Sequence, residues 1–364
     1  MKYKLSDICF YAKGKIDVSD LTNTYYVSTE NMLPNKAGVT AALSLPSTAQ
    51  TQAYQKGDVL VSNIRPYFKK IWFADCNGGC SNDVLVLRAK ENTDARFLYY
   101  VVSDDAFFNY SSATSKGTKM PRGDKTAIMQ YEVPYFELTT QKKIAGALSD
   151  IDYKIALNNN INNNLEQQVS VLYQSWFEDF EITNGICPEN WSHQELSTIA
   201  DIASGKRPPV KSDTCNEKTP ISIVGAASVM GFTSEANHTD KILVTGRVGT
   251  HGVIQRFNTP CWTSDNTLVI TSPYYEFTNQ ILHRIDYSSM NRGSTQPLIT
   301  QGDMKKVVVL VPDEDTLAKF EKFAGSLMAK WEANNNENVK LASLRDTLLP
   351  KLISGELDVS NIDL

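Results

Sequence analysis

Long apolar runs are absent from this 364-residue sequence, and none approaches the roughly 18 residues that a membrane-spanning helix needs. The opening residues, MKYKLSDICF, contain no extended apolar stretch followed by a small-residue cleavage site. We therefore expect neither a membrane span nor a secretory signal, and a soluble protein of the cytoplasm is the prediction.

Cysteine and histidine are scarce. The six cysteines are scattered, and only Cys76 and Cys80 lie close together, around Asn77-Gly78-Gly79. The four histidines form no spaced pair with them, whereas a zinc site needs about four ligands. We interpret the close pair as part of a turn between strands and expect reduced thiols, with no metal.

Nucleotide-binding motifs are also missing. The sequence contains neither a G-x-G-x-x-G stretch nor a Gly-Lys-Ser/Thr phosphate loop, so no cofactor is expected. The net charge of −5 excludes a surface built as a whole for nucleic acid but permits local basic patches. With 41% hydrophobic residues, the chain is long enough to form more than one globular core.

What the sequence does contain is an internal repeat. Residues 5–15 (LSDICFYAKGK) match residues 196–206 (LSTIADIASGK) at six of eleven positions with an offset of 191. Residues 81–87 match 264–270 at an offset of 183, and Gly117 to Pro121 match 293–297 at 176. The order is preserved and the offset drifts slowly, as loop insertions would cause, so the chain is interpreted as two copies of one unit, about 1–181 and 182–364.

Each copy changes character along its length. Its first part carries short β-branched and aromatic runs broken by Gly, Pro, Asn and Ser, which predicts a mixed, strand-rich domain. Its last 40 or so residues follow a heptad pattern, which predicts a long helix in a coiled coil. The seam positions are Leu148, Ile151, Ile155, Asn158, Asn162, Leu165, Val169, Leu172 and Trp176, then Ala324, Leu327, Trp331, Asn334, Asn338, Leu341, Arg345, Leu348 and Leu352.

Both helices place asparagine at two successive seam positions near their middle. A buried asparagine costs stability unless its amide finds a partner, so such residues set register and orientation in coiled coils. Antiparallel packing would pair Asn158 with Asn338 and Asn162 with Asn334, and we expect this arrangement because the second helix must return across a whole domain. The alternative, a polar linker that breaks the helix, is disfavoured because both copies keep the heptad phase.

The predicted fold is therefore α+β, with two similar strand-rich globular domains joined by a long antiparallel two-helix coiled coil and related by an approximate twofold. The boundaries are residues 1–140 and 182–313 for the domains and 141–181 and 314–364 for the helices, the last with a C-terminal tail. Two similar domains at a fixed separation match the symmetry of duplex DNA, whose half-sites lie about a helical turn apart. Because the domains differ in sequence, the two half-sites should differ too.

Several short segments carry a resemblance that covers nearly the whole chain. They are Lys56 to Ser62 with Asn63-Ile64-Arg65-Pro66, the Gly-Thr/Ser-x-x-Pro element with a following Val-Pro, Gln141 to Ile144, Pro188-Glu189-Asn190-Trp191 and Leu348 to Leu357. In their order and duplication, these segments resemble the specificity subunit of type I restriction-modification systems.

The two copies differ at one of these segments. The first copy has Ser62-Asn63-Ile64-Arg65-Pro66-Tyr67, whereas the second has Thr245-Gly246-Arg247-Val248-Gly249-Thr250, which is nearer the usual Arg-x-Gly pattern of the family. The two domains are therefore expected to use this loop differently.

The resemblance implies two target-recognition domains that read a split site on double-stranded DNA, without catalysis by this chain. It also implies that two methyltransferase subunits dock on the helices and that restriction subunits join them. The sequence agrees, because it contains no Asn-Pro-Pro-Tyr or Asp-Pro-Pro-Tyr motif of an adenine methyltransferase. The alternatives are an orphan specificity subunit that serves methylation only and a rigid two-domain scaffold for protein interactions.

The candidate DNA contacts lie in segments whose local charge is positive although the whole chain is acidic. Such patches suit phosphates, and forked or amide side chains among them can read bases. One of these positively charged segments, residues 245–256 of the second copy, also contains Arg256. The candidates are Arg65, Tyr67, Lys69, Lys70, Asn82, Lys116, Thr118, Lys119 and Arg122 in the first copy, and Arg207, Arg247, Thr250, His251, Asn266, Arg292, Ser294, Thr295 and Gln296 in the second.

Two further expectations concern aromatic residues and partner docking. Tyr67 and its neighbour Phe68 are expected in the core, with contact to a DNA groove as the alternative. Exposed edges of the coil, including Gln141 to Lys143 and Tyr173 to Phe177, are expected to dock the methyltransferase subunits.

Overall fold

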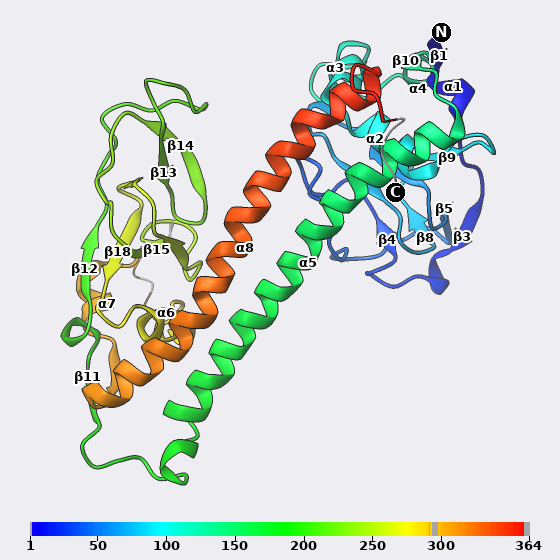
Figure 1. Cartoon of the computed structure of the whole chain (residues 1–364). Coiled ribbons are helices and arrows are strands. Elements are labelled where there is room, and N and C mark those ends of the chain that lie inside the picture. Colours follow the sequence, from blue (N-terminus) through cyan, green and yellow to red (C-terminus); the bar gives the residue numbers. More distant parts are fainter. Residues whose placement is uncertain (1, 291, 293–297, 360–364) are drawn as a thin grey trace. The chain divides into compact units, whose positions relative to one another are not determined.

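The computed structural model describes residues 2–290, 292 and 298–359 (Figure 1). The chain divides into two compact units. Unit 1 comprises residues 1–158 and 336–364, and unit 2 comprises residues 159–335. The two long helices contribute to both units, so the units do not coincide with the four predicted segments, and that division stays a prediction.

The elements of unit 1 begin with strand-rich structure and end in the first half of a long helix. Apolar runs such as Val59-Leu60-Val61 are fully buried, which explains why a short uninterrupted apolar segment becomes a strand here. The helix α2 begins where the Asp94 side chain accepts a hydrogen bond from the Phe97 backbone N–H at 2.9 Å. The bounds are β1 Lys2–Lys4, α1 Leu5–Ile8, β2 Cys9–Tyr11, β3 Lys15–Asp17, η1 Val18–Asp20, β4 Tyr26–Val27, β5 Gln50–Tyr54, β6 Val59–Ser62, η2 Pro66–Phe68, β7 Ile71–Phe73, β8 Gly78–Cys80, β9 Val84–Ala89, α2 Ala95–Ser103, α3 Asp105–Ala113, α4 Lys125–Ile128, β10 Glu132–Pro134 and α5 Leu138–Phe177.

Unit 2 repeats this plan. Its last element, α8, begins after Asp313, whose Oδ1 accepts a hydrogen bond from the Thr316 N–H at 3.0 Å and whose Oδ2 accepts one from the Trp191 indole at 2.9 Å. The bounds are η3 Glu181–Thr183, β11 Ser192–Glu195, η4 Leu196–Thr198, β12 Asp201–Ser204, β13 Ile221–Val224, β14 Val229–Thr233, β15 Ile242–Gly246, β16 Gln255–Phe257, β17 Cys261–Thr263, β18 Thr267–Thr271, α6 Tyr275–Arg284, α7 Gln301–Lys305, β19 Val308–Val311 and α8 Glu314–Ser354.

The sheets show the duplication directly. The antiparallel order β2-β9-β6-β7 in unit 1 corresponds to β12-β18-β15-β16 in unit 2, and the pair β1-β10 corresponds to β11-β19. A further sheet differs, being β3-β5-β8-β4 in unit 1 and β14-β13-β17 in unit 2, although each contains one parallel pair. The predicted pair of similar strand-rich domains is confirmed. The predicted turn around Asn77-Gly78-Gly79 holds only in part, because Cys76 and Asn77 lie in the connection between β7 and β8 whereas Gly78, Gly79 and Cys80 form β8 itself.

The ends of the long helices belong to the cores of the units. In unit 1, Leu148 of α5 and Leu352 of α8 lie in the same buried cluster as the sheet residues Val59 and Leu87. In unit 2, Phe177 of α5 and Phe320 of α8 have ring centroids 5.2 Å apart, in the cluster that also contains Phe277 of α6. Each unit is therefore held to its helix pair by shared apolar burial, which is the dominant favourable term in folding.

The helices α5 and α8 run antiparallel in both units, as predicted, and Figure 1 shows them side by side. In unit 1, Asn158 donates to Asn338 Oδ1 at 2.9 Å. In unit 2, Asn334 donates to Asn162 Oδ1 at 2.9 Å. Asn158 and Asn334 are each only 1% exposed, so both expected amide pairs are present inside the seam. The helix α5 ends at Phe177, and Phe180 takes a positive φ angle of 55° before η3 begins at Glu181.

Among the described residues, no helix combines the length and the apolar character that crossing a membrane requires. The same residues contain no group of three or more His, Cys, Asp or Glu side chains placed to hold a metal ion.

Candidate nucleic-acid interface

In unit 1, three loops that are far apart in the sequence meet beyond the end of β6. The Asn63 N–H donates to the Asp83 carbonyl at 2.8 Å, and the Arg65 N–H donates to the Pro121 carbonyl at 2.8 Å. We call residues 63–70, 81–83 and 115–123 loop cluster 1. It brings together the whole first set of predicted contacts, with Asn82, Thr118 and Lys119 exposed on it.

Two acidic residues partly neutralise loop cluster 1, namely Asp83 in its second segment and Asp124 directly after its third segment. Arg122 forms an ion pair with Asp83 at 3.1 Å, and Lys116 forms one with Asp124 at 2.6 Å. The ion pair with Lys116 lowers the pKa of Asp124. The positive charge counted along the sequence therefore overstates the local charge.

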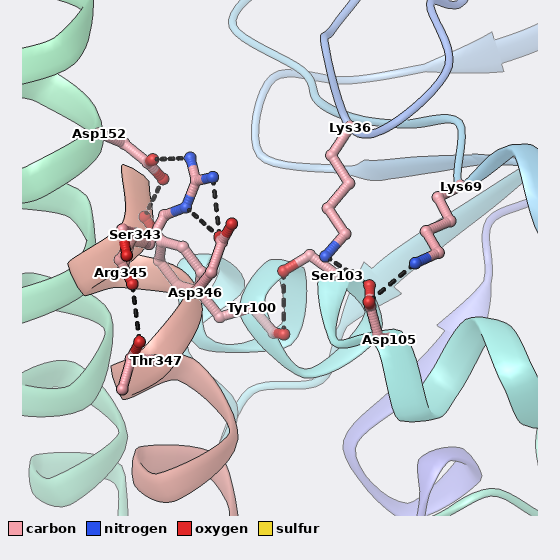
Figure 2. A network of polar contacts seen from close by, with 10 residues as sticks. All are labelled: Lys36, Lys69, Tyr100, Ser103, Asp105, Asp152, Ser343, Arg345, Asp346 and Thr347. Atoms are coloured by element: carbon pink, nitrogen blue, oxygen red, sulfur yellow. Dashed lines mark hydrogen bonds and ion pairs between the residues drawn. The ribbon is translucent and has the colours of Figure 1, made fainter. Parts of the chain in front are cut away.

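A second cationic group surrounds η2. Figure 2 shows that Lys36 and Lys69 both reach Asp105 at the start of α3, at 2.8 and 2.7 Å. Hydrogen bonds with Lys36 and Lys69 lower the pKa of this carboxyl group, although partial burial opposes the shift. Lys36 was missed by sequence reasoning because it lies about thirty residues before η2, and only the fold places it beside Lys69.

The predicted burial of Tyr67 and Phe68 is wrong. Tyr67 is 52% exposed and Phe68 is 38% exposed. The reason is the turn η2, in which Pro66 takes the buried position and leaves the two rings outside. Lys70 next to them donates to the Thr29 carbonyl at 2.6 Å, which ties its ammonium group to the loop.

Unit 2 repeats the backbone pattern of loop cluster 1 around different side chains. The Arg247 N–H donates to the Asn266 carbonyl at 2.8 Å, and the Ile299 N–H donates to the Arg247 carbonyl at 2.9 Å. Val248 and Leu298 form a bridge that corresponds to the one between Ile64 and Arg122. We call residues 246–252 and 264–266, with 292 and 298, loop cluster 2.

Loop cluster 2 brings together three of the predicted contacts, Arg247, Asn266 and Arg292. Arg292 also forms an ion pair with Asp303. Thr250 is exposed, whereas the neighbouring His251 is half-buried and places its Nδ1 3.1 Å from the Gly246 carbonyl. The other predicted contacts of this segment, Ser294, Thr295 and Gln296, lie outside the described residues.

Buried polar atoms without hydrogen-bond partners gather in these loops. Among the described residues they include Arg65 Nε, Arg247 Nε and His251 Nε2. A buried donor that finds no partner costs about 1–3 kcal/mol. Both loop clusters therefore hold donors whose pairing within the protein is incomplete.

Two of the predictions fail: Arg256 of unit 2 does not lie in a surface patch, and the edges of the coiled coil are exposed only in part. Arg256 does not belong to a surface patch, because its side chain is only 10% exposed and its guanidinium group makes two 2.7 Å hydrogen bonds to Glu276. Of the two coil edges that were expected to be exposed, Gln141, Tyr173 and Phe177 are buried in the units, whereas Lys142 and Gln174 are exposed. Arg207, by contrast, is exposed as expected.

Comparison with known proteins supports the resemblance found in the motifs. Residues 1–167 match the family described as type I restriction modification DNA specificity domain. The specificity subunit of the type I restriction enzyme HindI from Haemophilus influenzae is 22% identical, over 98% of this chain and 99% of the relative. The specificity subunit of the type I restriction enzyme MjaIX from Methanocaldococcus jannaschii is 25% identical, over 75% of this chain and 71% of the relative.

The fold agrees with that of a solved member. The crystal structure of the S subunit of a type I restriction-modification system from M. genitalium superposes with a TM-score of 0.57, at 19% identity, over 97% of this chain and 96% of that chain. The fold of this chain is therefore similar to that of a type I S subunit. The resemblance of this chain to the specificity subunits of type I restriction-modification systems is confirmed.

Proposed function

We propose that this chain is the DNA-recognition subunit of a type I restriction-modification complex in the cytoplasm. It binds a bipartite site on double-stranded DNA, and each loop cluster contacts one half-site. The observation that carries the proposal is the repeated backbone pattern, in which Asn63 and Arg247 occupy corresponding positions with different side chains. One scaffold with two sets of side chains supports the reading of two different half-sites.

The charges of the clusters suit this role. Arg, Lys and His side chains at the loop tips supply phosphate contacts, and Arg65, Asn82, Arg247, Asn266, Arg292 and Gln296 are the candidates for reading base edges.

Partner subunits complete the proposed complex. Two methyltransferase subunits dock on the helices α5 and α8, restriction subunits join them, and the catalysis belongs to those partners. Exposed apolar side chains on the helices support a docking role, with Tyr153 71% and Leu157 40% exposed one turn apart on α5. The asparagine pairs keep the two helices in register, which maintains the docking surface.

The test is the methylation of the host genome. Sequencing that detects modified adenine should reveal a split motif that disappears when this gene is deleted. Replacing residues 1–140 with the same region of a homologue should change one half of the motif only, and a change in both halves would refute the assignment of one half-site to each domain. The purified chain alone should transfer no methyl group from S-adenosylmethionine.

A further inference from the structure

Two aromatic rings project from unit 1 at the turn η2. The Tyr67 and Phe68 ring centroids are 4.7 Å apart, and the planes are inclined at 56°. Both side chains are more than a third exposed. Large exposed apolar groups placed side by side mark a contact surface more often than single ones do.

Backbone hydrogen bonds fix the turn that carries these two rings. The Phe68 N–H donates to the Arg65 carbonyl at 3.0 Å, and the Lys69 N–H donates to the Pro66 carbonyl at 2.9 Å. Arg65 and Lys69, on either side, have positive φ angles of 50° and 52°, a conformation that costs free energy in residues with a side chain. The neighbouring loop supports the turn, because the Asn35 N–H donates to the Phe68 carbonyl at 2.8 Å. Strain of this kind persists only where the surrounding structure maintains it, and it clusters at binding sites.

Cations surround the two rings. Lys36 and Lys69 share the single carboxylate of Asp105, so this group carries an excess of positive charge. The Lys70 ammonium group lies 6.0 Å from the Phe68 ring centroid, and Arg65 adds a guanidinium group at the start of the turn. Aromatic rings among cations suit a nucleic acid, which offers base faces between phosphates, better than the apolar groove of a protein.

The corresponding loop of unit 2 has no such pair. It contains Gly249 and Gly252, both with positive φ angles, and its exposed apolar side chain is Val253, which is 39% exposed. The exposed pair of aromatic rings, Tyr67 and Phe68, therefore distinguishes unit 1 from unit 2.

We propose that Tyr67 and Phe68 insert against the bases of the half-site that the first domain contacts and unstack a base step there. This inference rests on the proposed function. DNA-bending proteins use apolar wedges in this way, and the energy of unstacking depends on the base step, so the rings also contribute to specificity. The half-site contacted by unit 2 keeps its stacking at the equivalent position.

The experiment uses the complex of the full chain with its methyltransferase subunits and duplexes carrying the motif identified by methylation sequencing. 2-Aminopurine replaces single bases of each half-site in turn, always away from the adenine that is methylated. We expect a several-fold rise in fluorescence at one step of the first half-site and none in the second. The double variant Tyr67→Ala with Phe68→Ala should abolish the rise and weaken specific binding roughly tenfold. Val253→Ala is the matched control in unit 2 and should leave both readouts unchanged.

The outcomes separate this inference from the proposed function. If the wild-type complex binds the motif specifically without any rise in fluorescence, the insertion is refuted while DNA recognition stands. If no specific binding occurs at all, the proposed function fails. If the double variant keeps the fluorescence signal but loses methyltransferase binding in analytical ultracentrifugation, the rings contact a protein partner and the inference is overturned. Thermal unfolding of the variant checks its fold, and Tyr67→Trp should preserve the signal.

Discussion

Arg345 of α8 and Asp152 of α5 form a 2.8 Å ion pair in unit 1, and the Tyr100 hydroxyl of α2 donates to the same carboxylate at 2.7 Å (Figure 2). The sequence repeat places Val169 and Met328 at the corresponding positions of unit 2, where both are buried. At this position, therefore, unit 1 has a hydrogen-bonded ion pair between its helices where unit 2 has two buried apolar side chains.

The first prediction concerns this ion pair. Arg345→Val should lower the free energy of unfolding by roughly 1–3 kcal/mol, because Asp152 then keeps only the Tyr100 hydroxyl as a partner. Combining it with Asp152→Met, which reproduces the residues of unit 2, should recover much of the loss. Urea unfolding of both single variants and the double variant measures the coupling. Lys319→Ala removes an exposed ion pair with Asp315 and serves as the control, with an expected change under about 0.5 kcal/mol. Additive effects of the two substitutions would contradict the coupling.

The second prediction concerns the buried amides of unit 2. Asn334→Leu removes the donor to Asn162 Oδ1 and leaves a buried polar group in an apolar setting, so the chain should lose about 1–3 kcal/mol of stability. Replacing both residues with leucine should restore or raise the stability but relax the pairing register. Thermal unfolding gives the first effect, and native mass spectrometry detects the second as species with more than one chain. Equal melting temperatures for the single and double variants would rule out this explanation.

The third prediction concerns pH. Burial raises the pKa of Glu321 to about 7, although its carboxylate accepts hydrogen bonds from the Phe277 and Glu276 N–H groups at 2.8 and 3.2 Å. Between the usual pKa of a glutamate and about 7, the folded state binds more protons than the unfolded state. Stability should therefore fall as the pH rises through this window.

Glu321→Gln should remove that dependence. Relative to this variant, the wild-type chain should lose about 1–3 kcal/mol between pH 5 and pH 8. Melting temperatures of both proteins across the range provide the measurement. Parallel profiles would show that Glu321 does not titrate in the folded chain as described.

The fourth prediction separates base reading from phosphate contact. Arg247→Ala should lower the affinity of the complex for its motif by roughly 1–3 kcal/mol and relax the sequence preference at one base pair. Arg207→Ala should weaken specific and non-specific binding alike and reduce the slope of log K against log salt by about one unit. Fluorescence anisotropy at several salt concentrations distinguishes the two. Identical behaviour of both variants would remove Arg247 from the base contacts.

Much of the fold could be predicted because it depends on periodicity. The heptad phase of α5 and α8 and the repeated segments are local patterns, and the partners of Asn158 and Asn162 followed from pairing them antiparallel. The candidate site could be predicted less well from the sequence. Asp83 and Asp105 neutralise cations from distant segments, and neither pairing leaves a trace in a local count of charge.

The sequence alone determined that the chain contains a duplicated strand-rich unit and an antiparallel pair of helices with asparagines in the seam. The reason is that the spacing of hydrophobic residues and the internal repeat can both be identified directly in the order of the residues. The tertiary structure decided which side chains meet. It buried Arg256 against Glu276, exposed Tyr67 and brought Lys36 beside Lys69. The physical reason is that burial and charge pairing depend on contacts between segments far apart in the chain, which only the folded backbone brings within a few ångströms.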